Sequence, residues 1–435
     1  MAAADAESTG STPGRSSSGG VSRSGAPAVL DRQAVAGGAT ISGGVWAAIA
    51  VVLVALNLRP VIVAVAPLFE TISAELELSS FLAGLLVTLP VLCFGALGPL
   101  APVLAARLGF ERSLALVLLA IVGGSAIRLI PTIPGLFGGT LLLGAGIAIG
   151  NILLPGLIKR DFAHRLGLMS GLFSMCLAAG ATLAAGVTIP VAEAAGWEWN
   201  EALAAWGLFA IVGLACWVPS LWHARGSAGH PPTLGIRLSG DRVAWYVTAF
   251  FGLQSFNFYS TTAWLPTILI GYGHDAVFAG LMLSLVNLVS IVPALVVPLI
   301  LDRMRSQAGF TVFVSLLYFA AIGGLLAFPE AVVAWMVLLG LAQGAGLGLG
   351  LTFLVLRSPD AAHTTLLSGM AQSWGYLLAA IGPLALGALR DMSGAWVVPV
   401  LLLLVVLVPQ AIAAYLAGRP ALVGGGAARL EATEG

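Results

Sequence analysis

The sequence predicts an all-α membrane protein with twelve transmembrane helices in two pseudo-symmetric six-helix halves. Three observations lead to this fold class. First, 59% of the 435 residues are hydrophobic and only 9% are charged, whereas soluble domains carry about 25% charged residues. Second, apolar runs of roughly 20 residues, long enough to cross the hydrocarbon core as a helix, recur along the chain. Third, the two halves share an internal repeat.

The apolar runs define twelve predicted spans and the segments around them. The domain boundaries expected from them are a cytoplasmic, disordered tail over 1–42, a six-helix bundle over 43–222, a Gly/Pro-rich cytoplasmic linker over 223–241, a second bundle over 242–417 and a tail over 418–435. The predicted spans are 44–68, 80–105, 112–131, 135–158, 167–190, 202–222, 243–270, 276–300, 309–328, 332–356, 364–389 and 395–417.

The arginines and lysines predict the orientation. With an even number of spans, most of the 19 basic residues fall on the side of the termini, and the opposite loops hold only Arg390 beside several glutamates. Positive charge accumulates in cytoplasmic loops, so both termini are expected in the cytoplasm and the protein in the plasma (cell inner) membrane. Two basic residues, Arg59 and Arg128, lie within predicted spans.

The repeat has an offset of about 200 residues. "GAGIAIG" (144–150) corresponds to "GAGLGLG" (344–350), and the same register places Asn57 over Asn257 and Arg59 over Tyr259. Duplicated halves with a central site are typical of secondary transporters. The alternative is that glycine-rich helices look alike because small residues allow close packing.

Short cytoplasmic motifs occupy equivalent places in the two halves. "LAARLGFER" (104–112) and "LILDRMR" (299–305) resemble the charged signature of the major facilitator superfamily, although Ala106 stands where an acid is expected. This resemblance implies a gating latch formed by Arg107, Arg112, Asp302 and Arg303. "LNLRP", "NILLPGLIKRDF", "AWLP" and "SGMAQSWGYLLAAIGP" together resemble the cyanate transporter and 2-nitroimidazole transporter family of that superfamily. That family implies transport of small polar or anionic solutes.

Arg59 is the leading candidate for binding the solute. A charge at the bilayer centre costs on the order of 2.5–3.5 kcal/mol without a partner, and no acidic residue lies near the middle of any predicted span. A planar guanidinium can bind an anion through two parallel hydrogen bonds. The missing counter-ion is therefore expected to be the solute itself. In the superfamily, helices one, four, seven and ten line the cavity, which favours Arg59 over Arg128.

Other embedded polar residues have a structural alternative as well as a binding role. Asn57 points about 200° away from Arg59 on a regular helix and could stabilise the kink at Pro60. If the repeat holds, Tyr259 faces Arg59 across the site. Amides and hydroxyls within the membrane also join helices, and that alternative applies to the substrate-binding candidates Asn151, Gln254, Asn257, Gln372 and Tyr376. The last candidate, Arg128, lies three residues before Pro131 near the outer end of its span, where the alternative is that its side chain extends to the membrane interface.

The predicted function is secondary active transport of a small anionic or weakly acidic solute, cyanate-like or nitrogen-containing, by alternating access. The alternative is efflux of nitroaromatic or drug-like compounds. No phosphate-binding G-x-x-x-x-G-K-[ST] loop, HExxH or G-x-S-x-G occurs in a suitable place, so neither ATP drive nor enzymatic activity is expected. We expect no cofactor, metal or nucleic acid. The expected partners are lipid and a coupled proton or exchanged anion, and the protein is expected to be a monomer.

Overall fold

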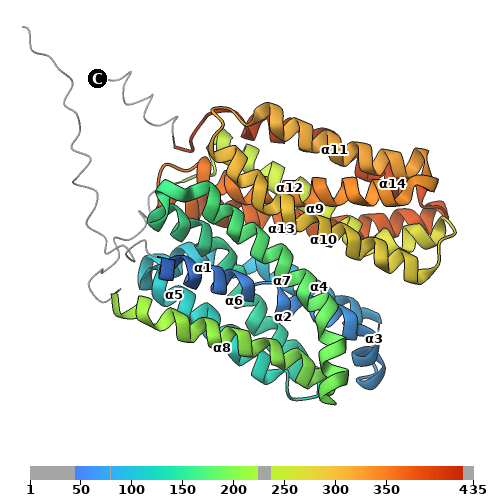
Figure 1. Ribbon diagram of the computed structural model, residues 1–435, viewed down its shortest axis with the longest axis horizontal. Coiled ribbons are helices and arrows are strands. Elements are labelled where there is room, and N and C mark those ends of the chain that lie inside the picture. The colour runs from blue at the N-terminus through green and yellow to red at the C-terminus, as the bar shows by residue number, and fades with distance from the viewer. Residues whose placement is uncertain (1–44, 79, 224–236, 425–435) are drawn as a thin grey trace, which may run out of the picture. The chain divides into compact units, whose positions relative to one another are not determined.

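The computed structural model describes residues 45–78, 80–223 and 237–424, and these form helices joined by short connections (Figure 1). The predicted N-terminal tail, most of the linker and the end of the C-terminal tail lie outside the described residues. Helices of the first half are α1 (Val45–Asn57), α2 (Pro60–Val63), α3 (Val65–Glu75), α4 (Ser80–Leu97), α5 (Leu100–Ile127), α6 (Ile133–Asp161), α7 (Leu166–Ala195) and α8 (Trp199–His223). Those of the second half are α9 (Arg242–Gly271), α10 (Ala276–Asp302), α11 (Ala308–Ala327), α12 (Val332–Leu356), α13 (Ala361–Ser393) and α14 (Val397–Ala417).

The helices agree with twelve crossings of a membrane, two of which are interrupted. The first crossing is divided into α1, α2 and α3. The second combines α4 with the start of α5, because Gly109 (φ 80°, ψ 167°) breaks α5 and begins the third crossing. Positive φ is accessible to glycine without a steric penalty. The predicted spans 80–105 and 112–131 therefore correspond to helices on either side of Gly109.

Among the described helices, nine are long and apolar enough to span a membrane by length and composition alone. α9 and α13 are not among them. α9 carries Gln254 and Asn257, and α13 carries Gln372 and Ser373, all of them buried. Both helices thus combine membrane length with polar positions inside the protein, and both contribute to the cavity described below.

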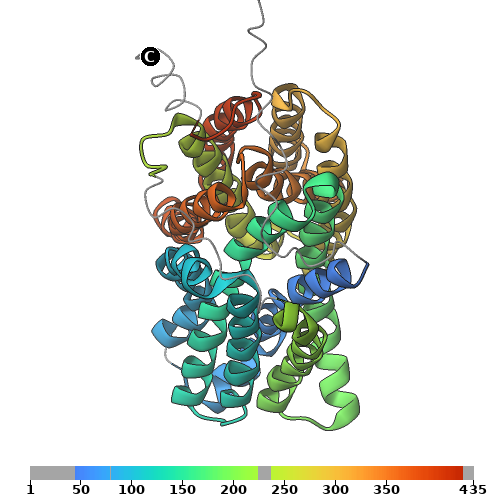
Figure 2. The ribbon, with the colours of Figure 1, turned by 90° about the vertical axis from the view of Figure 1, so that its left-hand side faces the viewer.

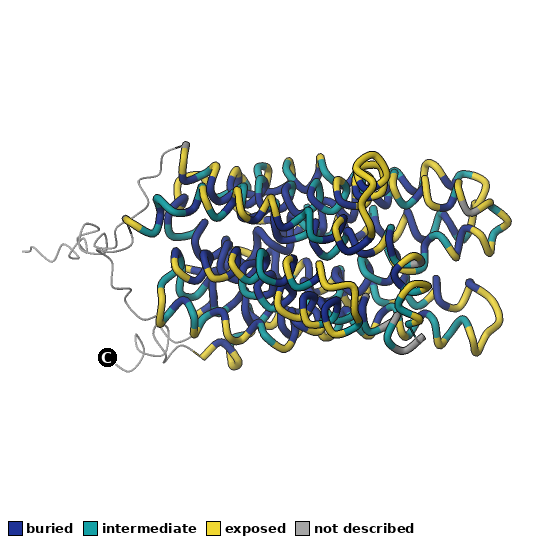
Figure 3. Tube along the Cα trace, turned by 90° about the horizontal axis from the view of Figure 1, so that it is seen from below, coloured by how far each residue is buried: buried dark blue, intermediate teal, exposed yellow. Residues whose placement is uncertain are grey.

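Buried positions follow the inner faces of the helices, and exposed positions lie on the outside (Figure 3). Leu208 and Phe209 in α8, Val292 in α10 and Leu384 in α13 are among the large exposed apolar residues. An apolar outer surface suits contact with lipid. The helices also satisfy their backbone polar groups internally, which the absence of water in the bilayer core requires.

The buried apolar residues form three clusters whose arrangement defines the two ends of the bundle. We call the end at which α1 begins and α14 ends the terminal end. The largest cluster combines residues of both halves, for example Phe94, Ile152 and Leu349. A second cluster contains residues of α9–α14 only, and a third contains residues of the first half only, including Leu68 and Trp199. The halves thus share one core towards the terminal end and have separate cores towards the other end. Figure 2 gives a second view of the two groups of helices.

Close backbone approaches join the halves near the terminal end. A Cβ atom on Gly171 of α7 would lie 2.6 Å from the carbonyl oxygen of Leu295 of α10. Lys159 Nζ donates to the carbonyl of Val355 at 3.2 Å, and Gln372 Nε2 donates to the carbonyl of Asn151 at 3.0 Å. Small residues allow helices to approach this closely.

Candidate functional site

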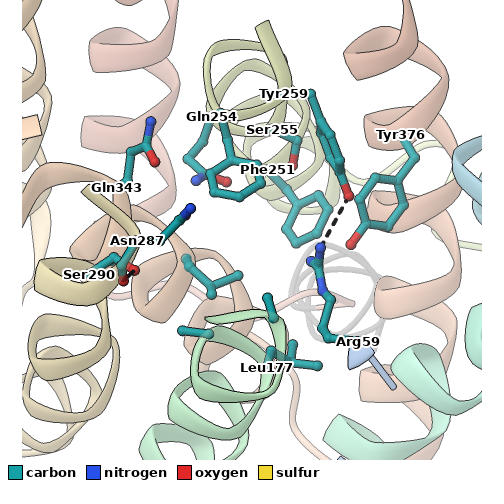
Figure 4. Close-up of a pocket in the computed structure, with 15 residues that line it drawn as sticks. Arg59, Leu177, Phe251, Gln254, Ser255, Tyr259, Asn287, Ser290, Gln343 and Tyr376 are labelled. Carbon is teal, nitrogen blue, oxygen red and sulfur yellow. Dashed lines mark hydrogen bonds between the residues drawn. The ribbon is translucent and has the colours of Figure 1, made fainter. Parts of the chain in front are cut away.

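A cavity lies at the boundary of the two halves (Figure 4). It encloses about 600 Å³ of space not filled by atoms, part of it open to solvent. The first half contributes Arg59 and residues of α7, and the second half contributes residues of α9, α10, α12 and α13. The lining residues are Arg59, Leu177, Ala178, Ala181, Phe251, Gln254, Ser255, Phe258, Tyr259, Asn287, Ser290, Gln343, Gly344, Leu347 and Tyr376.

Arg59 reaches the cavity from the break between α1 and α2. Proline disfavours the helical conformation in the residue before it, and Arg59 takes φ −119° and ψ −41° before Pro60 starts α2. The break has a direct consequence for the side chains: Arg59 points to the second half, whereas Asn57, two residues earlier, points to α8. The predicted divergence of these two side chains agrees with their positions.

The guanidinium group of Arg59 has few partners within the protein. Its Nη1 atom donates to the hydroxyl of Tyr259 at 3.5 Å, which is long for a hydrogen bond, and its Nε atom has no hydrogen-bond partner among the described residues. None of the cavity-lining residues is acidic. A guanidinium offers five N–H donors, so most of them remain available to an electronegative group in the cavity. Arg59 and Tyr259 also occupy equivalent positions of the sequence repeat, 200 residues apart.

Aromatic rings form the wall next to Arg59. The ring of Tyr376 lies 5.0 Å from that of Phe94, 5.5 Å from that of Phe251 and 6.2 Å from that of Tyr259, centroid to centroid. Tyr259 in turn meets Phe258 edge-on at 5.3 Å. Such pairs fix one another's orientation. The guanidinium therefore lies against a rigid aromatic surface that carries two phenol hydroxyls.

Four polar lining residues were not singled out by the sequence, and these are Ser255, Asn287, Ser290 and Gln343. Asn287 and Ser290 lie on α10, the eighth crossing, and the family pattern drew attention to crossings one, four, seven and ten instead. The signal that could have found them is a polar pair, Asn287 and Ser290, at i and i+3 in the otherwise apolar run "SLVNLVS" (284–290).

Asn57 and Asn257 lie outside the cavity lining and make equivalent contacts in the two halves. Asn57 Nδ2 donates to the carbonyls of Leu53 (2.8 Å) and Phe209 (3.2 Å), which joins α1 to α8. Asn257 Nδ2 donates to Gln410 Oε1 (2.8 Å), which joins α9 to α14. Their positions match the helix-joining alternative that the sequence left open for both.

This placement gives a test. We expect Asn57→Leu and Asn257→Leu each to lower the free energy of unfolding by about 0.6 kcal/mol, and by less than about 1.7 kcal/mol, because that is the usual range for hydrogen bonds between membrane helices. The dissociation constant of a bound solute should change little. Thermal unfolding in detergent measures the first quantity and ligand titration the second. A large loss of affinity in a variant of normal stability would contradict the helix-joining role.

Arg128, Asn151 and Gln372 also lie outside the cavity lining. Arg128 is fully buried, and its guanidinium donates to the carbonyl of Val61 (2.7 Å) and to the hydroxyl of Thr140 (2.7 and 3.2 Å). It thus holds α2 against α6 from the end of α5. Gln372 bonds the backbone of Asn151 between the halves.

The side chains assigned to the latch, Arg107, Arg112, Asp302 and Arg303, are exposed. Ion pairs between the described residues instead join Arg160 to Glu111 (2.5 Å) and Asp161 (2.6 Å) within the first half, and Asp360 to His363. Asp302 packs against the start of α7, since a Cβ atom on Gly167 would lie 2.5 Å from its Cβ. Of the four latch residues, Asp302 therefore has a contact with the opposite half.

Comparisons with known proteins identify the family. Residues 38–383 match the model of the Major Facilitator Superfamily. The chain is 41% identical to the "Uncharacterized transporter YycB" of Bacillus subtilis (86% of this chain, 94% of the relative). It is 39% identical to the "2-nitroimidazole transporter" of Escherichia coli (85% and 94%) and 31% identical to its "Cyanate transport protein CynX" (79% and 89%).

The fold is similar to that of solved transporters of the superfamily. The proton:xylose symporter XylE superposes with a TM-score of 0.70 at 13% identity, covering 87% of this chain and 97% of the symporter. The predicted fold class and the predicted resemblance to the cyanate and 2-nitroimidazole transporters are thus confirmed. The matched family and relatives are transporters rather than enzymes. The chain belongs to the major facilitator superfamily and is a multi-pass membrane transporter.

Proposed function

We propose that this protein is a secondary active transporter that moves a small anionic or weakly acidic solute by alternating access. The observation that carries the proposal is Arg59, an embedded cation that reaches a cavity between the halves whose lining contains no acidic residue. A solute with oxygen or nitrogen lone pairs supplies the partner that the chain does not. Two relatives are named as transporters of cyanate and of 2-nitroimidazole, and both compounds fit this description of the solute.

A second candidate function is efflux of nitroaromatic compounds. It is favoured by the aromatic wall of Tyr376, Phe251 and Tyr259 and by the 39% identity to a 2-nitroimidazole transporter. A nitro group presents two electronegative oxygens to a guanidinium, so both functions use the same site. They differ in the direction of transport.

The proposed orientation has both termini in the cytoplasm and the protein in the plasma membrane, because the basic residues gather on the terminal side. In this orientation the shared core closes the cytoplasmic side of the cavity, and the latch residue Asp302 lies at that closure. Uphill transport is proposed to be driven by a coupled proton or an exchanged anion, by a protein acting as a monomer.

Transport by purified protein in proteoliposomes tests the proposal. The panel consists of cyanate, nitrate, nitrite, benzoate and 2-nitroimidazole, each with an imposed pH gradient of either sign. We expect saturable transport of at least one of these solutes, with a direction that follows the pH gradient or an exchanged anion. Proteoliposomes that transport none of them above protein-free controls would overturn the proposed function. When the orientation of the protein in the vesicles is known, net transport from its cytoplasmic side to its outer side would favour the efflux candidate.

A further inference from the structure

The cavity has two chemically different walls (Figure 4). One wall carries the guanidinium of Arg59 and the phenols of Tyr259 and Tyr376. On the other side, the carboxamides of Gln254 and Asn287 face one another, with the ring of Phe251 between the two walls. The charged wall combines residues of both halves, whereas the carboxamide wall comes from α9 and α10 of the second half alone.

The carboxamides of Gln254 and Asn287 have no hydrogen-bond partner among the described residues, and Figure 4 draws no bond to either of them from a neighbouring lining side chain. Gln254 is only 3% exposed. Both carboxamides line the cavity, so their donors and acceptors are available to a group bound there. The carboxamide of Gln343, which also lines the cavity, donates instead to Thr261 (2.8 Å) and Tyr318 (3.1 Å).

We propose that Gln254 and Asn287 form a second recognition subsite, and that the preferred solute is a planar aromatic or heteroaromatic anion with a hydrogen-bonding group on the edge away from its charge. This inference rests on the proposed function and specifies its solute class. The anionic group binds Arg59 and Tyr259, the flat ring lies against Phe251, and the distal hydroxyl or ring N–H meets the carboxamides.

The chemistry of the subsite sets its selectivity. A carboxamide carries two N–H donors and an accepting oxygen, so a pair of them accommodates a hydroxyl or a ring nitrogen that both donates and accepts. A three-atom anion engages only the charged wall. Sites built to bond a polar substituent reject analogues that lack it, because their own polar groups are then left buried and unpaired. The distal group is therefore expected to contribute selectivity, and Arg59 the general affinity for anions.

The test compares 4-hydroxybenzoate with benzoate by isothermal titration of the purified full chain in detergent. We expect the wild type to bind 4-hydroxybenzoate at least about tenfold more tightly, which corresponds to one net hydrogen bond. Asn287→Leu and Gln254→Leu, which are close to the originals in size, should each reduce that ratio towards one while benzoate affinity stays within about threefold.

Gln410→Leu is the matched control, because this carboxamide joins α14 to α9 away from the cavity. It should lower thermal stability and leave the affinity ratio unchanged, which separates a structural effect from selectivity. Equal binding of the two acids by the wild type, or an unchanged ratio in both subsite variants, overturns the subsite while leaving the proposed function intact. Binding of cyanate without either aromatic acid does the same. Failure of all these anions to bind overturns the proposed function and the subsite together.

Discussion

Replacing Arg59 with glutamine is expected to weaken binding of an anionic solute by roughly 2–5 kcal/mol, about 30-fold to several thousand-fold, because it removes one partner of a desolvated charge pair. The guanidinium makes few hydrogen bonds within the protein. The substitution should therefore lower the affinity for the solute and change the free energy of unfolding of the solute-free protein little. Arg59→Lys keeps the positive charge but loses the planar guanidinium group, so the affinity of this variant should lie between those of the wild type and Arg59→Gln. Titration and proteoliposome uptake measure the change.

Arg242→Gln is a suitable control, since it removes the same charge at the exposed start of α9, away from the cavity. It should bind and transport as the wild type does. The role of Arg59 as an anion-binding group would be wrong if both Arg59 variants transported every accepted solute at the wild-type rate.

A valine in place of Gly171 is expected to hinder closure of the terminal end. Its Cβ would lie 2.6 Å from the Leu295 carbonyl oxygen, where even a weak C–H···O contact keeps about 3.3 Å. Overpacking of this kind costs typically about 1–3 kcal/mol, which changes the ratio of two conformations by roughly 5- to 150-fold. Transport should fall accordingly. Ser373 is buried near Gly98 in the interface between the halves. A maleimide probe should therefore label a cysteine at this position (Ser373→Cys) faster when Gly171→Val is also present than when it is absent.

Gly186 provides the control on the same helix, because a Cβ atom there would meet nothing within 4 Å. Gly186→Val should leave transport and labelling unchanged. Normal transport by Gly171→Val would mean that the close approach of α7 and α10 is not part of the transport cycle.

The sequence was sufficient for the fold and for the centre of the candidate site. Apolar length predicted the twelve crossings, and the repeat between segments 200 residues apart predicted the facing of Arg59 and Tyr259. Asn287 was missed: the sequence shows its i,i+3 pairing with Ser290 in an apolar run, but its exposure to the cavity depends on how α10 packs against α7 and α12. Asn57 and Asn257 likewise required the structure, since their partners Phe209 and Gln410 are over 150 residues away.

The division of the buried residues into three clusters has a consequence for synthesis. The third cluster is complete once α8 has been inserted, whereas the shared cluster requires segments from α9 to α14. At about 5–20 residues per second, the roughly 200 residues of the second half take on the order of 10–40 s to emerge. During that interval the inner face of α6 and α7, including Gly171, has lipid or the insertion machinery as its neighbour. The first half can thus complete its own core before the helices that form the shared core with it have been made.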